Sequence, residues 1–248
     1  MKVETSTGNA TIETSSFLFM GHPGIGKTTL WAGFPNVLGI ITSKKEVRRV
    51  KVPHITISDW GECEAAVDYF IDSNKYLIGS LDLINVIYDY AIDKSLLKFK
   101  IKHQSDIKFG KAYDYGKGLF RGVVNKLVSS NKGIIFICHT TEREILKDTG
   151  MVIKTIPLLN KHAKEILLPL INEIGYINFN DVKRKEKDKE GKTVWETKRY
   201  ITFEPSEFVE AKDRDGYLPS HIPLSKDPVK TFNLMKSFYT GERNKEDY

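Results

Sequence analysis

The sequence predicts an α/β fold built on a largely parallel central sheet. Short apolar segments alternate with segments of helical spacing between residues 16 and 179, an order typical of parallel strands joined by crossover helices. The clearest strand, Gly133 to Cys138, is apolar at nearly every position and follows an Asn-Lys-Gly turn. Its lack of alternation indicates burial on both faces. The length of 248 residues is sufficient for a large core without disulfide or metal staples.

The elements before residue 139 follow in a regular order. An apolar run leads into a glycine-rich turn at 21–26 and then into the start of a helix. In the later segments, short apolar runs predict strands, and apolar residues at helical spacing predict helices. The expected strands are 16–20, 37–42, 54–57, 76–78 and 133–138. The expected helices are 27–32, 62–72, 81–97 and 117–130.

The C-terminal part has a different character. A helix is expected over 161–174, with Leu167, Leu168 and Ile171 on one side, and a strand over 176–179. The charged run 183–192, with Gly191 near its tip, and the alternating stretch 193–203 predict a β-hairpin that extends the sheet antiparallel. No repeat or Pro/Ser-rich linker divides the chain, so we expect a polar N-terminal segment at 1–15 and a single domain at 16–248.

The glycine-rich turn matches the pattern G-x-x-x-x-G-K-[ST]. It lies between an expected strand and an expected helix, which is the context that this motif requires. Glycines let the backbone wrap around phosphate oxygens, Lys27 reaches the β- and γ-phosphates, and the Thr28 hydroxyl binds Mg²⁺. The motif therefore predicts a P-loop NTPase that binds ATP and Mg²⁺. The residues expected to bind the nucleotide are Gly21, His22, Pro23, Gly24, Ile25, Gly26, Lys27, Thr28 and Thr29.

Hydrolysis also needs an acid at the end of a second strand, to hold the magnesium shell. The expected strand at 76–78 leads into Gly79 where an aspartate would be required. Asp82 comes three residues later, in the expected following helix. Asp82 is therefore a candidate metal ligand together with Thr28, or an acid that stabilises a helix N-terminus.

Charge and composition bear on partners and location. The net charge is +6 with a pI near 9.0, and the excess lies in three segments, 44–51, 98–111 and 183–199. Such patches are typical of proteins that bind a polyanion, although solvated loops give the same pattern. Two cysteines without a CxxC pair, a polar N-terminus and the absence of a run of about 18 apolar residues predict a cytoplasmic protein without a membrane partner.

With these motifs placed, the chain resembles the RecA-fold phage nucleotide-binding proteins, whose better-studied members act in single-strand annealing and recombination. The resemblance spans roughly residues 16–239 and rests on 21–29, 76–89, 115–116, 134–139, 168–176 and 211–219. It implies a RecA-like fold and a homo-oligomer. Lys212 and Arg214 resemble a Lys-x-Arg pair that touches the γ-phosphate held by a neighbouring subunit, and His139 resembles a γ-phosphate sensor. The alternatives are a charged surface turn and a histidine that caps a strand.

The chain departs from this family at two acidic positions. The family usually has acid-x-glutamate after its second strand, where this chain reads Thr42-Ser43-Lys44, and Gly79 stands at the other position. Glu46 could substitute only if the loop register shifts. Loss of a positioned catalytic group commonly costs roughly 10²- to 10⁴-fold in rate, so ATP binding is expected and hydrolysis is expected to be slow, rescued by other residues, or absent.

Three functions remain open. The first is an oligomeric ATP-dependent protein acting on single-stranded DNA in phage recombination or replication, in the host cytoplasm and with other phage proteins as partners. Its DNA surfaces would be 98–111 and the 183–199 hairpin, with Phe99, Phe109, Tyr113 and Tyr115 stacking on bases or packing the loop. The second is a nucleotide-gated scaffold without hydrolysis. The third is a small-molecule P-loop kinase, which would need an acceptor pocket and a lid.

Overall fold

The computed structural model describes residues 10–106, 110–148, 150–187 and 193–248. Its strands are β1 (Ser16–Gly21), β2 (Val37–Ile41), β3 (His54–Thr56), β4 (Ile78–Asp82), β5 (Gly133–Cys138), β6 (Thr140–Lys147), β7 (Gly150–Pro157), β8 (Glu173–Lys187), β9 (Thr193–Thr202), β10 (Lys212–Asp213) and β11 (His221–Pro223). Its α-helices are α1 (Lys27–Trp31), α2 (Trp60–Asp72), α3 (Ile84–Phe99), α4 (Lys111–Val128), α5 (Lys161–Leu167) and α6 (Pro228–Tyr239), with 3₁₀ turns at Gln104–Asp106 and Lys245–Asp247.

The central sheet is mostly parallel, which confirms the predicted α/β class. In the described residues its order is β11-β9-β8-β1-β5-β4-β2-β3, with β10 paired to β8. The pairs from β8 through β1, β5, β4 and β2 to β3 are all parallel. The β8–β9 hairpin and β11 continue the sheet antiparallel. The carboxyl ends of the parallel strands therefore meet at one edge, where ligands usually bind in open α/β sheets.

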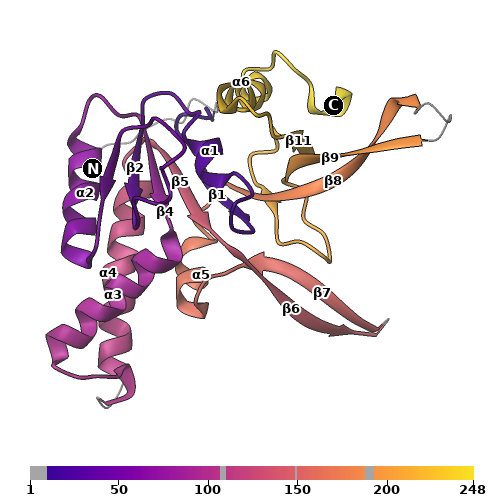
Figure 1. The fold of residues 1–248 in the computed structure, drawn as a ribbon. Coiled ribbons are helices and arrows are strands. Elements are labelled where there is room, and N and C mark those ends of the chain that lie inside the picture. The colour runs from indigo at the N-terminus through magenta and orange to yellow at the C-terminus, as the bar shows by residue number, and fades with distance from the viewer. Residues whose placement is uncertain (1–9, 107–109, 149, 188–192) are drawn as a thin grey trace, which may run out of the picture.

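Helices cover both faces of the sheet (Figure 1). On one face, α2, α3, α4 and α5 pack against side chains such as Leu18, Met20 and Phe136. On the other face, α1 and α6 pack against Phe17, Phe19 and their neighbours. Alternate residues of the same strand thus enter two different cores, which explains why the central strands are continuously apolar.

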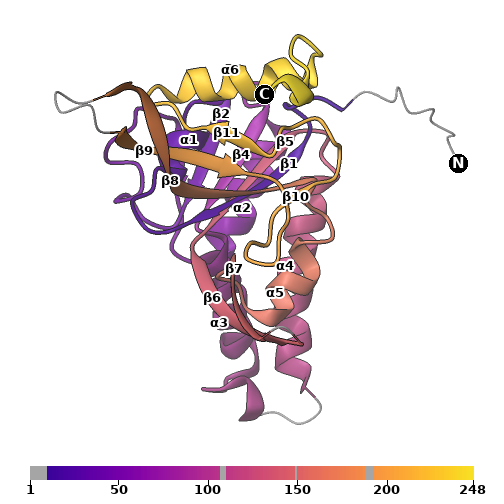
Figure 2. The ribbon, with the colours of Figure 1, turned by 90° about the vertical axis from the view of Figure 1, so that its right-hand side faces the viewer.

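Helix α6, the β6–β7 hairpin and the short strands β10 and β11 were not assigned from the sequence. Helix α6 begins after Asp227, whose side chain caps the Val229 amide, and it buries Phe232 and Phe238 against the α1 face. The β6–β7 hairpin follows β5 and forms a two-stranded sheet of its own, projecting from the central sheet in both views (Figure 2). Among the described residues, no helix is both long and apolar enough to cross a membrane.

The boundaries of several elements differ from those expected. The helix predicted over 161–174 ends at Leu167, because Pro169 has no amide hydrogen that could donate to the Glu165 carbonyl and continue the helix. Helix α4 begins at Lys111 rather than at 117. Upstream of β1, Ile12 is buried in the α1-side core, and Glu13 pairs with Lys236 of α6 at 2.6 Å. Residues 10–15 are therefore packed onto the same body as the strands.

Candidate functional site

The glycine-rich turn lies at the carboxyl edge of the parallel strands, between β1 and α1. Gly24 has a φ of 77° and Gly26 a φ of 113°, a region of backbone conformation that L side chains rarely adopt. The Ile25 amide donates to the His22 carbonyl at 3.3 Å and closes the turn. Left-handed glycines at these two positions let the loop double back before the helix starts at Lys27.

Lys27 is buried at the base of this loop. Its Nζ donates to the carbonyls of Gly21 at 2.8 Å and His22 at 2.9 Å, and to Nδ1 of His139 at 3.1 Å. His139 comes directly after β5, which lies next to β1. Burial lowers the pKa of Lys27, an effect opposed by the Asp82 carboxylate. Burial and then the Lys27 charge lower the pKa of His139, which favours the neutral imidazole, the form in which Nδ1 can accept from Lys27.

Asp82 completes the base of the site. Its Oδ2 accepts from Thr28 Oγ1 at 2.8 Å and from Trp31 Nε1 at 2.9 Å. Its Oδ1 is buried and has no hydrogen-bond partner among the described residues. Burial raises the pKa of this carboxyl, while the Trp31 and Thr28 hydrogen bonds and the Lys27 charge oppose the rise. A buried carboxylate oxygen without a partner, beside a threonine hydroxyl, is the oxygen-donor chemistry that Mg²⁺ requires.

This geometry corrects the assignment of Gly79 as the position of a lost acid. Strand β4 runs from Ile78 to Asp82, so Asp82 ends the strand and does not belong to the following helix. A Cβ atom at Gly79 would lie 2.9 Å from two ring carbons of Phe70 on α2. Gly79 is therefore a packing glycine inside the strand. The strand was predicted too short because Gly79 and Ser80 interrupt its apolar pattern.

A turn after β2 adds a second carboxylate. Val47 is buried and anchors residues 44–49, and Glu46 lines the same cavity, about 580 Å³, as Lys27, Thr28 and His139. Burial and then the nearby Asp82 carboxylate raise the pKa of Glu46. The second acid is therefore present in the cavity without being at Lys44, the position that alignment with the related family indicated.

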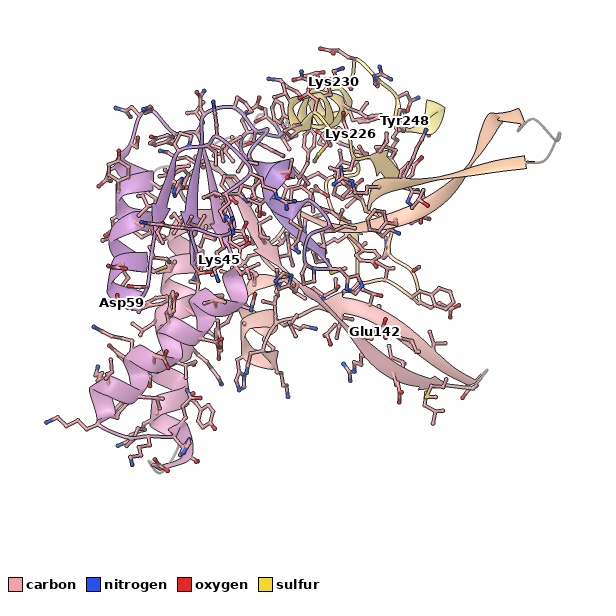
Figure 3. All side chains as sticks on the ribbon, in the orientation of Figure 1. Lys45, Asp59, Glu142, Lys226, Lys230 and Tyr248 are labelled. Carbon is pink, nitrogen blue, oxygen red and sulfur yellow. The ribbon has the colours of Figure 1, made fainter. Side chains whose placement is uncertain are left out.

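The same turn brings basic side chains to the cavity. Lys45, Arg48 and Arg49 line it together with Thr29. In Figure 3 Lys45 lies near the centre of the molecule, whereas Glu142 marks the projecting hairpin. The basic segment 44–51, which the charge pattern suggested as a polyanion-binding patch, thus contributes cations to the phosphate-loop cavity. Among the described residues there is no group of three or more His, Cys, Asp or Glu side chains that could hold a metal. A Mg²⁺ ion held by Thr28 and Asp82 would take its remaining ligands from water and phosphate oxygens.

Arg199 of β9 contacts the phosphate loop, a contact that the sequence did not indicate. Its Nη1 donates to the Ile25 carbonyl at 3.0 Å. In a trans peptide the C=O and the following N–H point in opposite directions, so this hydrogen bond turns the Gly26 amide away from Arg199. Alternation along β9 predicts which face Arg199 lies on, but only the tertiary structure shows that this face meets Ile25.

Lys212 and Arg214 are not part of this site in the same chain. Strand β10 pairs with the start of β8, at Glu173 and Ile174, whereas the phosphate loop lies at the opposite edge of the sheet. Lys212 Nζ donates to the carbonyls of Leu168 and Ile171, at 3.2 and 2.5 Å. Arg214 Nη2 donates to the Pro169 carbonyl at 2.6 Å. A role in the site of a neighbouring subunit remains a prediction.

The two basic segments proposed for DNA lie far apart. Residues 98–111 join the ends of α3 and α4, and the 183–199 segment lies on the β8–β9 hairpin, which projects from another side in both views (Figures 1 and 2). Lys98 Nζ lies 3.7 Å from the centre of the Tyr115 ring, which packs edge-on against Phe99. Phe109 and residues 188–192 lie outside the described residues.

One of three comparisons with known proteins assigns the chain to a family. No curated protein matches the sequence. Among solved structures, the chain is similar to a prototypical ATPase from the type III secretion system of pathogenic bacteria, with 14% identity and a TM-score of 0.40, over 67% of this chain and 51% of that one. The chain thus spans about half the length of that ATPase. A family model described as AAA domain matches residues 13–215. This is most of the sequence, so the chain belongs to the AAA domain family and contains a nucleotide-binding P-loop ATPase domain.

Proposed function

We propose that this domain binds ATP with Mg²⁺ and hydrolyses it. The observation that carries the proposal is the pairing of Thr28 Oγ1 with Asp82 Oδ2 at 2.8 Å, beside a buried Asp82 Oδ1 that has no partner in the described part of the chain. Thr28 and Asp82 would hold the ion, Asp82 through a water or directly. When bound, Mg²⁺ would neutralise charge on the phosphate oxygens.

The remaining residues have roles that follow from their contacts. Lys27 would exchange the loop carbonyls that it now contacts for β- and γ-phosphate oxygens, which form stronger, charge-assisted hydrogen bonds. Its pKa, lowered by burial, rises again beside phosphate. His139 would contact the γ-phosphate from the next strand. The raised pKa of Glu46 suits a base that orients a water and accepts its proton.

Glu46 in the cavity and the buried Asp82 behind Thr28 favour hydrolysis over a scaffold that only binds nucleotide. The scaffold was inferred from an apparent absence of both acids, and Asp82 and Glu46 remove that reason. A small-molecule kinase would need an acceptor site and a lid, and the groove between the loop and β8 is assigned below to the nucleotide itself.

We also propose that the domain is a homo-oligomer that acts on single-stranded DNA, in phage recombination or replication in the host cytoplasm and with phage proteins as partners. This rests on the resemblance to RecA-fold phage proteins, on the exposed lysines of 98–111, and on Lys212 and Arg214, which lie far from the phosphate loop of their own chain. A pair at the opposite sheet edge could reach a phosphate only across a subunit interface.

The test is steady-state phosphate release with and without single-stranded DNA, with the oligomeric state measured in the same buffer. We expect Mg²⁺-dependent turnover by the unmodified protein and a loss of roughly 10²- to 10⁴-fold in Glu46→Gln, with ATP affinity retained. Lys27→Ala should lose binding as well. ATP binding without turnover would favour the scaffold instead.

The interface has its own test. Lys27→Ala and Arg214→Ala proteins should be inactive alone and should recover part of the activity when mixed, because one subunit then supplies the loop and the other the arginine. DNA affinity should fall steeply with salt if the lysines contact phosphates. A monomer at all concentrations with nucleotide, without salt-sensitive DNA binding, would refute this part of the proposal.

A further inference from the structure

A second groove adjoins the phosphate loop on the side opposite the basic turn. Its volume is about 580 Å³, and it lies between residues 22–25 of the loop and Tyr176, Asn178 and Phe179 of β8. Pro23 and Gly24 line both this groove and the cavity around Lys27. One ligand could therefore lie with its charged end at Lys27 and its other end in this groove.

The groove exists because two neighbouring strands have different lengths. Strand β1 ends at Gly21, opposite Ile177, whereas β8 continues to Lys187. Beyond Ile177, β8 has no β1 residue beside it, and the phosphate loop turns away from this edge. The edge of β8 and the loop thus form the two walls.

The lining is chemically unlike that of the phosphate cavity. None of the described residues that line it is Lys, Arg, Asp or Glu, so it offers no strong attraction to another phosphate. The Phe179 side chain is 60% exposed, although the ring belongs to one of the most hydrophobic residue types. An aromatic ring beside a proline forms a surface on which a flat, uncharged ring can stack.

The Phe179 side chain lies on the face of β8 that meets the phosphate loop. Phe179 pairs with Arg199 of β9 in the antiparallel register, so the two side chains lie on the same face of the sheet, and Arg199 Nη1 donates to the Ile25 carbonyl of the loop at 3.0 Å. Asn178, the residue before Phe179, has its side chain on the opposite face.

We propose that this groove binds the nucleobase of the nucleotide, with Phe179 stacking on the base. The inference rests on the proposed nucleotide function and adds the residues that recognise the part of the ligand beyond the phosphates. A peptide segment of a neighbouring subunit is the other occupant of an apolar groove, and the test separates the two.

The experiment compares two ligands by titration calorimetry with Mg²⁺ present: ATP, and inorganic tripolyphosphate, which has the phosphates without the base. Phe179→Ala should weaken ATP binding about tenfold, because base–aromatic stacking is worth roughly 1 to 3 kcal/mol, and about 1.4 kcal/mol is tenfold in affinity. Tripolyphosphate binding should be unchanged. Phe179→Trp should retain ATP affinity, because it restores an aromatic surface.

Phe208→Ala is the matched control. Phe208 is 56% exposed on another part of the molecule, so its removal alters a similar area and should leave both affinities unchanged. Unchanged ATP affinity in Phe179→Ala would overturn the inference while leaving nucleotide binding intact, and a peptide occupant would give that result. Equal weakening of ATP and tripolyphosphate would also overturn it, because the residue would then act through the loop. If the unmodified protein bound neither ligand, the proposed function itself would fail.

Discussion

Replacing Gly79 tests which residue ends the strand beside the metal position. If Gly79 stood where an acid belongs, Gly79→Asp would restore hydrolysis. In the structure Gly79 is buried in β4, and an added Cβ would approach two Phe70 ring carbons to 2.9 Å. The Phe70 side chain is fully buried in the helical core, so the ring has little room to move.

The size of the effect follows from this contact. Overpacking a well-packed core costs about 1 to 3 kcal/mol, and about 1 kcal/mol changes the Tm of a chain this long by roughly 2 to 4 °C. Gly79→Ala should therefore lower the Tm by about 2 to 12 °C. Gly79→Asp should cost more, because it also buries a carboxylate with no designed partner.

The assay is thermal unfolding by circular dichroism, combined with phosphate release. Gly118→Ala on α4 is the control, because no described heavy atom lies within 4 Å of the Cβ that would be added, and alanine stabilises an exposed helix position by about 0.5 to 1 kcal/mol. A Gly79→Asp protein with the same Tm as the wild type and faster ATP hydrolysis would refute the assignment of Asp82 as the acid that ends the strand.

Two further predictions concern other parts of the molecule. Burial, with Asp213 second, raises the pKa of Glu173 to about 9 from an ordinary 4.5; the folded chain thus holds a proton that the unfolded chain releases, and stability falls as pH rises between these values. Glu173→Gln should therefore raise the Tm relative to wild type more at pH 8.5 than at pH 5, and an equal change at both would contradict the reasoning. Arg199→Gln should weaken ATP and tripolyphosphate alike by about tenfold, because the Gly26 amide loses its fixed orientation. The control is Arg121→Gln, an exposed change on α4, which should leave both affinities unchanged. Titration calorimetry measures the affinity of each variant for ATP and for tripolyphosphate.

The parts of the fold that are encoded locally could be predicted from the sequence. The motif from Gly21 to Thr29 combines a buried strand, obligatory turn glycines and a helix start within one short segment, and β5 is apolar throughout. Both signals depend on neighbouring residues alone. The order of alternating segments was then sufficient for the α/β class.

The rest depended on contacts between distant segments. In the sequence, Gly79 resembles the end of a strand. In the structure, the ring of Phe70 on the preceding helix fills the space above Gly79, and this contact explains the glycine. Glu46 reaches the site because buried Val47 fixes the turn around it. Arg199 contacts a loop 174 residues earlier in the chain. No spacing rule along the chain predicts such contacts.

The central claim is that Asp82 and Thr28 hold the magnesium ion of bound ATP. The most direct measurement is the affinity for ATP with Mg²⁺ and with EDTA, in the wild type and in Asp82→Asn, which keeps the side-chain shape and removes the charge. We expect Mg²⁺ to tighten ATP binding in the wild type, and we expect Asp82→Asn to lose most of that gain while its metal-free affinity stays the same or improves. An equal gain from Mg²⁺ in both proteins would contradict the claim.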